Sequence, residues 1–360
     1  MIRVLYISRP TLFSTPGGDT IQMVKTKDFL ERDYDIKIDI ETSGKSLDYN
    51  NYDLIHFFNI IRPNNILPHI ESGIPYVVSP IYVDYSEYDQ KIRGGFTAKV
   101  SKKIGKNKTE YLKSVARWVK NGEYPGSKYY LIHGYKSSIR KILDNCSALL
   151  PNSQNELNRI KSDFSFDAES FIVPNAVDSS LFKKETNAVR SGVLCVARIE
   201  GLKNQLNLIK AIKQTDYHLT IIGNASPNHI EYYKECRREA NDQITFIEHC
   251  NQEELIKYYQ KSKVHAMVSW FETTGLSSLE AAASGCNIVI SDKGDQKDYF
   301  KNDVLYANPS SIESIKSAVQ NAYNSKGSEN LLDRINNDFT WEEAAKITFK
   351  AYEESISNHK

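Results

Sequence analysis

The sequence of 360 residues has few cysteines, and those few are scattered. There are five, an odd number: Cys146, Cys195, Cys236, Cys250 and Cys286. Disulfide frameworks use paired cysteines in secreted chains, and zinc sites use closely spaced ones. The pattern therefore predicts reduced thiols, and it excludes a disulfide framework and a cysteine-based metal site.

Long apolar runs are also missing. No stretch reaches the roughly 18 consecutive apolar residues that a membrane-spanning helix needs. The residues from Met1 to Ser8 are typical of a short strand, and no small-residue cleavage site follows them. We therefore expect a cytoplasmic protein without a signal peptide. Charged residues at 25% and hydrophobic residues at 40% are ordinary for a globular protein.

Strand-like runs alternate with segments of helical periodicity along most of the chain. Strands are expected at 3–8, 53–58, 75–79, 148–151, 170–173, 192–197, 218–223, 243–247, 263–268 and 287–290. Repeated β-then-α segments are typical of parallel sheets covered by helices. Since the length exceeds one ordinary core, we predict an α/β protein of two Rossmann-like domains, 1–185 and 186–340, which face each other across a crevice. A C-terminal helix at 341–360 is expected to pack back on the first domain.

The net charge of +1 hides a strongly basic segment. Between Lys91 and Lys141, fourteen basic residues stand against two acidic ones. Apolar residues are interleaved with the basic ones, a pattern that suits an anionic membrane surface. A solvated helical insertion is the alternative, and no recognition motif supports binding of nucleic acid. The residues expected to dock on a membrane are Lys99, Lys102, Lys103, Lys106, Lys108, Lys113, Arg117 and Trp118.

The most informative stretch runs from Trp270 to Gly285 and carries two carboxylates, Glu272 and Glu280, on either side of a glycine-containing turn. Apolar runs precede and follow it, so it falls in a strand–turn–helix–strand unit. Glu272 is then near the carboxyl end of a strand, where open α/β sheets bind ligands. Backbone N–H groups at the helix start favour an anion such as a diphosphate. The alternative is a capping box of Ser277 with Glu280, which needs no ligand.

Two other stretches offer groups to an anion. Arg198 follows a predicted strand and Lys203 stands at the start of the next helix, where both cations can neutralise a diphosphate. A solvated loop with surface charges is the alternative. After the first strand, Gly17 and Gly18 precede a helical segment and allow a ligand to approach the backbone closely, although a simple turn is also possible.

These motifs, in this order, resemble those of retaining GT-B glycosyltransferases of family four. The resemblance also includes the stretches 173–178, 219–224 and 291–294, and it is dense from Val173 to Gly294. It implies a retaining, metal-independent enzyme of the hexosyltransferase type. Such an enzyme moves a sugar from a UDP- or GDP-sugar to a hydroxyl group of a saccharide, for example a lipid-linked one, in the assembly of bacterial surface polysaccharide or glycoconjugates. The donor is a substrate, and no cofactor or metal is expected.

The resemblance also implies roles for single residues. Arg198 and Lys203 bind the donor diphosphate, Glu280 binds the nucleotide ribose, and Glu272 contacts the donor sugar near the reacting face. We expect Glu272, Arg198 and Lys203 to be catalytic, because the two cations stabilise the charge of the departing diphosphate. The other residues implied in donor binding are Gly17, Gly18, Gly223, Asn224, His249, Thr273, Thr274, Gly275, Leu276 and Ser277.

The sequence departs from the family's pattern in two places. Thr273 and Thr274 stand where the family has glycine and phenylalanine, and we expect them to influence the choice of donor sugar. The histidine that many members carry after the third strand of the N-terminal domain aligns with Ile81 or Tyr82. We therefore expect Tyr82 or Asp84 to line the acceptor side instead.

Two remaining patterns have structural explanations. His56 lies inside an apolar run and is predicted to be a core or sheet-end histidine. The sequence Asp33-Tyr34-Asp35 precedes a strand instead of ending one, so we predict a solvated loop and no metal site. Two other functions stay open: a nucleotide-sugar epimerase of similar fold, and a non-catalytic protein that binds a nucleotide or a partner.

Overall fold

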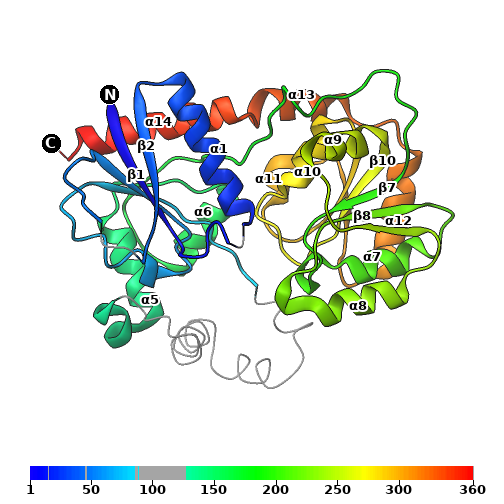
Figure 1. Ribbon diagram of the computed structural model, residues 1–360, viewed down its shortest axis with the longest axis horizontal. Coiled ribbons are helices and arrows are strands. Elements are labelled where there is room, and N and C mark those ends of the chain that lie inside the picture. Colours follow the sequence, from blue (N-terminus) through cyan, green and yellow to red (C-terminus); the bar gives the residue numbers. More distant parts are fainter. Residues whose placement is uncertain (15, 45–46, 86–87, 89–126, 360) are drawn as a thin grey trace. The chain divides into compact units, whose positions relative to one another are not determined.

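The computed structural model describes the chain except for residues 15, 45–46, 86–87, 89–126 and 360 (Figure 1). The chain divides into two compact units, one of Met1–Asn175 with Trp341–Lys360 and one of Ala176–Thr340. The residues predicted to dock on a membrane, from Lys99 to Trp118, lie outside the described residues. Among the described helices, none combines the length and apolar character that a membrane crossing requires.

The division lies between Asn175 and Ala176, so the expected boundary at residue 185 is too late. The Val177 N–H donates to the Phe339 carbonyl at 2.9 Å. Phe182 packs against Tyr259 in the core of the second unit. These contacts attach the segment before residue 185 to the second unit.

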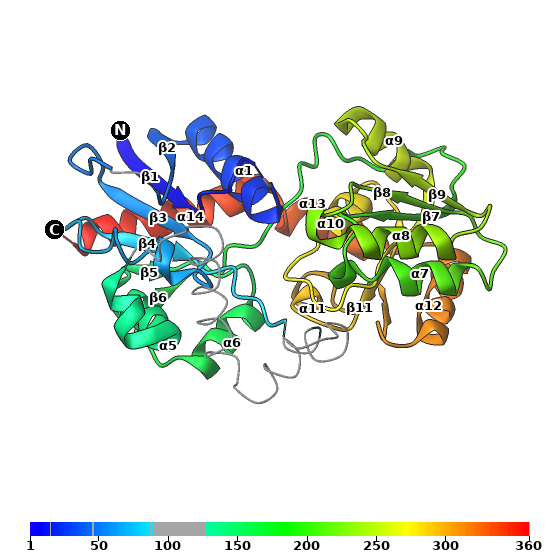
Figure 2. The same cartoon turned by 60° about the horizontal axis from the view of Figure 1, so that its bottom comes forward.

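The first unit is a six-stranded parallel sheet in the order β2-β1-β3-β4-β5-β6, whose strands can be followed in Figure 2. The strands are β1 (Ile2–Ser8), β2 (Ile36–Thr42), β3 (Leu54–Phe58), β4 (Tyr76–Ser79), β5 (Ala148–Leu149) and β6 (Glu169–Ser170). The described helices are α1 (Gly18–Asp33), η1 (Pro63–Asn65), α5 (Lys128–Asn145), α6 (Gln154–Asp163) and α14 (Trp341–Ser357).

Neighbouring residues of the central strands contact different helices. Leu5 and Ile7 of β1 belong to one apolar cluster with Ile139 of α5 and Ile160 of α6. Tyr6 lies on the opposite face, where its hydroxyl meets helix α14. Both faces are thus covered, which explains why the strands read as nearly continuous apolar runs.

A buried polar network joins α14 to this sheet. His56 of β3 shares one hydrogen bond with the Tyr352 hydroxyl at 2.6 Å and another with the Ser79 hydroxyl at 2.9 Å. Tyr352 in turn donates to the Tyr6 hydroxyl at 2.9 Å. Burial lowers the pKa of His56 to about 3, so the ring is neutral. The prediction of a core histidine is confirmed.

Removal of the Tyr352 hydroxyl tests this network. Tyr352→Phe keeps the buried ring but leaves His56 and Tyr6 each without one partner. We expect the free energy of unfolding to fall by about 1–3 kcal/mol, measured by urea denaturation. Tyr34→Phe is the matched control, because the Tyr34 ring stacks on Phe349 of α14 while its hydroxyl bonds to no described residue. An equal change in both variants would contradict the role of the network.

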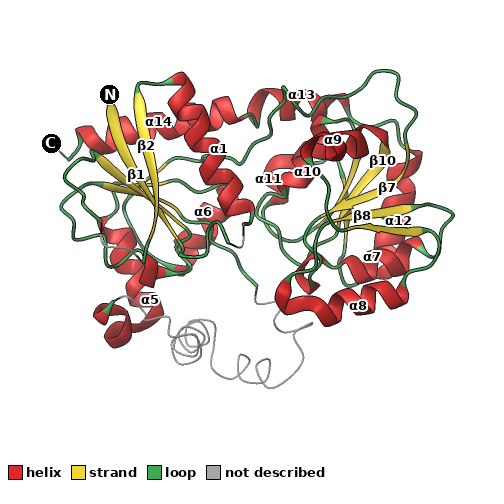
Figure 3. Ribbon diagram, in the orientation of Figure 1, coloured by secondary structure: helices red, strands yellow, loops and turns green. Residues whose placement is uncertain are grey.

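The second unit is also a six-stranded parallel sheet, in the order β12-β11-β10-β7-β8-β9. Its strands are β7 (Ser191–Val196), β8 (Leu219–Ile222), β9 (Ile244–Ile247), β10 (Ser262–Met267), β11 (Asn287–Ser291) and β12 (Leu305–Ala307). Its helices are η2 (Gly201–Lys203), α7 (Gln205–Ile212), η3 (Pro227–His229), α8 (Ile230–Glu239), α9 (Gln252–Lys261), α10 (Leu276–Ala283), α11 (Gln296–Phe300), α12 (Ile312–Asn324) and α13 (Glu329–Asp338). Helices α7, α8 and α12 cover one face, and α9 and α10 cover the other (Figure 3).

The strand order of the second unit reverses between the neighbouring strands β7 and β10. From β7 the chain proceeds to β8 and β9 on one side, and it then crosses to β10, β11 and β12 on the other. The loops that follow β7 and β10 diverge at this reversal, and open parallel sheets bind ligands at such a switch point. The two predicted α/β sheets are confirmed. The loops at the switch point, where a ligand is expected to bind, are those at 197–204 and 268–275.

Candidate functional site

The loop after β7 is fixed by one asparagine. Asn204 adopts a left-handed conformation with φ 60°, and its Nδ2 donates to the carbonyls of Val268 at 3.0 Å and Pro309 at 2.9 Å. The Trp270 N–H donates to the Leu202 carbonyl at 2.9 Å. The loops after β7 and β10 are thereby joined, and the residue between Leu202 and Asn204 is held at the switch point.

That residue is Lys203, and its partner is Glu272. The Lys203 Nζ lies 2.5 Å from the Glu272 Oε1, and the Ser269 hydroxyl donates to the same oxygen at 2.8 Å. The two side chains are only 19% and 10% exposed. Two of the three predicted catalytic residues therefore meet at the carboxyl edge of the sheet, where an anion can compete with Glu272 for the ammonium group.

The backbone of Glu272 packs directly against that of Gly294. The Asp295 N–H donates to the Glu272 carbonyl at 2.8 Å, and Glu272 and Gly294 form a short parallel bridge. A Cβ added to Gly294 would lie 2.0 Å from the Glu272 carbonyl oxygen, and the residue has φ +86°. Only glycine permits this approach, so the backbone at Glu272 depends on it.

We expect Gly294→Ala to displace the Glu272 loop and to lower the free energy of unfolding by several kcal/mol. Gly73→Ala separates collision from backbone strain, because Gly73 has φ +80° but its Cβ would meet nothing within 4 Å. Strain alone costs about 1–2 kcal/mol. Guanidinium denaturation of both variants measures the difference, and equal losses would show that the contact with Glu272 is unimportant.

The turn after Glu272 starts helix α10 at Leu276. Gly275 is the N-cap, in a left-handed conformation with φ 75°, and no side chain caps the helix. The N–H groups of Leu276 and Ser277 find no acceptor within the helix, as is general for a first turn. Ser277 is therefore inside the helix, and the alternative of a capping box with Glu280 is wrong, because the helix begins earlier than that pattern requires.

Glu280 has a different partner, which the sequence did not reveal. The Tyr259 hydroxyl, from α9, donates to the Glu280 Oε2 at 2.8 Å. Tyr259 is fully buried, and burial together with the nearby Glu280 carboxylate raises its pKa well above the usual value. The phenol therefore stays protonated and orients one oxygen of a half-buried carboxylate.

The two threonines of the turn differ in their surroundings. Thr274 is buried, its hydroxyl donates to the Tyr299 hydroxyl at 3.1 Å, and its carbonyl accepts from the Gln296 Nε2 at 3.3 Å. The prediction that the Thr274 side chain faces a donor is therefore corrected: it packs the turn against α11. Thr273 is half-buried, and its predicted influence on donor choice stays a prediction.

The remaining predicted donor residues of this unit follow neighbouring strands. The Arg198 side chain is 52% exposed and lies 3.5 Å from Glu200. Gly223 has φ +145°, and its Cβ would lie 2.1 Å from the Ala197 carbonyl oxygen, so glycine is required there. Asn224 and His249 are exposed, and their roles stay predictions.

The predicted residues of the first unit divide into two groups. Gly17 is the N-cap of α1, which begins at Gly18, and the predicted role of both with a donor is untested. Beside them Arg9 donates to both Asp19 oxygens, at 2.8 and 3.1 Å. Burial alone would raise the Asp19 pKa, but Arg9 and the Thr20 N–H outweigh it and lower that pKa.

The acceptor-side prediction for Tyr82 is corrected by its position. Tyr82 is buried in the core cluster of the first unit, and its hydroxyl donates to Asp163 at 2.5 Å. Its ring is part of the packing because α6 covers it. Asp84 is half-buried, and its acceptor role stays a prediction.

No metal site was predicted at Asp33-Tyr34-Asp35, and both of its carboxylates pair with positively charged groups. Asp33 accepts from Arg32 at 2.7 Å, and Asp35 pairs with the Met1 ammonium group at 2.8 Å. In the part of the chain that the structure describes, no three His, Cys, Asp or Glu residues are grouped as metal ligands. All five cysteines are free thiols.

The second unit is similar in sequence to a known protein family. The family model described as glycosyl transferases group 1 matches residues 178–338, nearly the whole second unit. The chain is 22% identical over 239 residues to an MMP alpha-(1->4)-mannosyltransferase of Mycolicibacterium hassiacum, which covers 62% of this chain and 58% of that one. It is 27% identical over 211 residues to the O-antigen chain mannosyltransferase RfbU of Salmonella typhimurium, which covers 55% of this chain and 57% of that one. The chain therefore matches less than two thirds of the length of these relatives.

Solved structures resemble the fold over nearly its whole length. Sucrose-phosphate synthase from Thermosynechococcus elongatus gives a TM-score of 0.77 at 15% identity, covering 99% of this chain and 100% of that one. Anabaena Alr3699/HepE in complex with UDP gives 0.68 at 14% identity, covering 97% and 99%. The predicted GT-B fold and the resemblance to group 1 glycosyl transferases are confirmed, while assignment to family four stays a prediction.

Proposed function

We propose that this protein is a glycosyltransferase that moves a sugar from a nucleotide-diphosphate sugar to a hydroxyl group of a saccharide, with retention of configuration and without a metal ion. The observation that carries the proposal is the meeting of Lys203, Glu272 and the first turn of α10 at the switch point of a parallel sheet. The match of the second unit to the group 1 family model supports it. HepE, which shares the fold, was solved with UDP and with UDP-glucose, which supports a nucleotide-sugar donor.

Each group at the site has a task in this reaction. The Lys203 ammonium and the Leu276 and Ser277 N–H groups bind the diphosphate, and Arg198 reaches it from the loop after β7. Breaking the bond at the anomeric carbon leaves negative charge on the diphosphate, which these groups stabilise because they are positioned beforehand. Glu280, oriented by Tyr259, accepts hydrogen bonds from the ribose hydroxyls, and Glu272 contacts the sugar.

Retention follows if the acceptor hydroxyl attacks the face from which the diphosphate departs. The departing phosphate then takes the proton of that hydroxyl, so no protein base is required. NMR of the product decides the point: the transferred sugar is expected to keep the anomeric configuration of the donor, and the opposite anomer would contradict retention.

The donor is identified by a panel of nucleotides and nucleotide sugars. A bound donor raises apparent stability by mass action, so one base and one sugar should raise the melting temperature most. UDP- and GDP-sugars are expected to lead the panel, with chelator present to exclude a metal requirement. A flat response across the whole panel would count against the proposal.

Activity then separates the proposal from its two competitors. With the best donor, the transferase is expected to release nucleoside diphosphate when a saccharide acceptor is supplied. Isomerised donor without any acceptor would identify an epimerase, and tight binding with neither transfer nor hydrolysis would identify a non-catalytic protein.

For the acceptor we propose a lipid-linked saccharide of surface polysaccharide assembly, reached from the cytoplasmic face of the plasma membrane. The mannosyltransferase RfbU, named for the O-antigen chain, supports this class of acceptor. The basic segment between Lys91 and Lys141 supports an anionic surface. Co-sedimentation with anionic but not neutral liposomes is expected, and equal binding to both would contradict it.

A further inference from the structure

A pocket of about 400 Å³ lies within the second unit, away from Lys203 and Glu272. Its lining includes Asn287 and Ile288 at the start of β11 and Leu305 at the start of β12. Lys203 and Glu272 follow the carboxyl ends of β7 and β10. Because all the strands are parallel, the pocket lies at the amino ends of the strands and the proposed donor site lies at their carboxyl ends.

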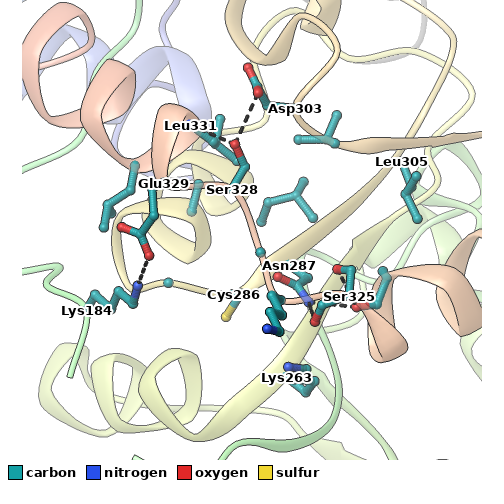
Figure 4. Close-up of a pocket in the computed structure, with 18 of the residues that line it drawn as sticks. Lys184, Lys263, Cys286, Asn287, Asp303, Leu305, Ser325, Ser328, Glu329 and Leu331 are labelled. Atoms are coloured by element: carbon teal, nitrogen blue, oxygen red, sulfur yellow. Dashed lines mark hydrogen bonds and ion pairs between the residues drawn. The ribbon is translucent and has the colours of Figure 1, made fainter. Parts of the chain in front are cut away.

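Four cations and two carboxylates line this pocket, and both carboxylates already have partners. Glu329 pairs with Lys184 at 2.6 Å, an ion pair at one side of the pocket in Figure 4. Asp303 accepts from Arg334 at 2.5 Å and from the Ser328 hydroxyl at 3.1 Å. The carboxylates are therefore not available to neutralise the other cations of the lining.

Those other cations are Arg190, Lys263 and Lys326. Arg190 donates to three carbonyl oxygens, for instance that of Ser284 at 2.5 Å, and also lies against the Cys286 thiol, so within the described residues no carboxylate pairs with it. Within the described residues, the Lys263 and Lys326 ammonium groups make no hydrogen bond or ion pair. Positive charge without a carboxylate partner thus gathers at a concave surface, which is the condition for binding a phosphate group.

One side chain offers an oriented acceptor in the same pocket. The Asn287 Nδ2 donates to the carbonyls of Ala322 at 2.6 Å and Ser325 at 3.1 Å, which fixes the amide (Figure 4). Its Oδ1 bonds to no described residue, and a Cβ on Gly327 would lie 2.7 Å from it. Any side chain at position 327 would press against this oxygen, so the glycine leaves space beside it.

We propose that this pocket is a second ligand site, which binds a small phosphorylated polyol such as a sugar phosphate. Lys263 and Lys326 receive the phosphate, Arg190 adds positive charge to the same lining, and the Asn287 Oδ1 accepts from a hydroxyl group. A volume of about 400 Å³ is within the range of small-ligand pockets. The site does not depend on the proposed transferase activity, because none of its residues belongs to the Lys203 and Glu272 cluster.

Calorimetric titration of the full chain with glucose 6-phosphate tests the proposal, with and without saturating UDP. One site per chain is expected, with an affinity that UDP and Lys203→Ala leave unchanged. Replacing Lys263 and Lys326 together by glutamine is expected to weaken binding about tenfold or more. Lys210→Gln, in the same unit but outside the pocket, is the control and is expected to bind as the unaltered chain does.

Several outcomes would overturn the second site. Absence of heat at millimolar glucose 6-phosphate, or unchanged affinity in the double variant, would remove it. Competition by UDP would assign the binding to the Lys203 site instead. Equally tight binding of inorganic phosphate would overturn the assignment of a polyol. If no nucleotide or nucleotide sugar of the panel binds, the proposed function fails while the glucose 6-phosphate result still stands.

Discussion

Lys203→Ala is expected to lower the rate of sugar transfer by about a hundredfold or more, which is the usual effect of removing one positioned donor from a developing oxyanion. The Lys203 ammonium is the least exposed cation of the site and is held at 2.5 Å from Glu272. Steady-state kinetics with the best donor of the panel measure the loss in kcat. Unchanged kinetics would contradict the assignment of Lys203 to the diphosphate.

Two companion variants make this result interpretable. Lys210→Ala, in α7, removes a lysine of the same unit that lies outside the site, and it is expected to keep normal kinetics. Among the described residues, Lys203→Ala also leaves the buried Glu272 carboxylate with the Ser269 hydroxyl as its one remaining partner. Because that loss can lower stability, Glu272→Gln is measured beside it: it keeps Lys203 and is expected to reduce transfer while diphosphate binding persists.

The second large effect is a loss of stability in mild acid. Burial lowers the pKa of His56 in the first unit and of His265 in the second to about 3. Both are neutral when folded but titrate near 6.5 when unfolded, so the unfolded chain binds more protons below pH 6.5. The contribution of these two histidines to stability is therefore fully present above pH 6.5. Below it, the free energy of unfolding falls by about 1.4 kcal/mol per histidine for each pH unit toward pH 3. Urea denaturation between pH 7 and 4.5 measures the slope.

Replacing each histidine by leucine separates the two contributions. Both ring nitrogens of His265 are buried and bond to no described residue, so His265→Leu is expected to raise stability at pH 7 by about 1–3 kcal/mol and to reduce the acid slope of the second unit. His56→Leu is expected to lower stability at pH 7, since the Tyr352 and Ser79 hydroxyls each lose their hydrogen bond to the ring. A stability independent of pH between 6.5 and 4.5 would contradict the buried, neutral state of both rings.

The order of motifs along the chain predicted most of the fold, because each strand buried on both faces is a recognisable apolar run. One of these strands was not predicted, and another is shorter than expected, each for a local reason. Strand β12 (Leu305–Ala307) is a short edge strand, and β5 (Ala148–Leu149) is shorter than the apolar run that contains it. The spacing of Ser277 and Glu280 suggested a capping box, but the helix begins at Leu276, after the left-handed Gly275.

The site residues that directly follow a strand could be predicted from the sequence. The residues from distant segments that hold them in place could not. Lys203 and Glu272 each follow a strand, and the parallel topology brings them together. Tyr259, which orients Glu280, comes from the face of another helix and left no sign in the sequence. Tyr82 was misjudged because its burial by α6 depends on packing between segments far apart in the chain.

Hydrogen exchange of the full chain, with and without the best nucleotide sugar of the panel, tests the central claim most directly. We predict that the donor slows exchange in peptides covering 197–204 and 268–281, because its diphosphate covers the N–H groups at the switch point of the second sheet. Protection confined to other peptides, or none at saturating donor, would show that the Lys203 and Glu272 cluster does not bind the donor.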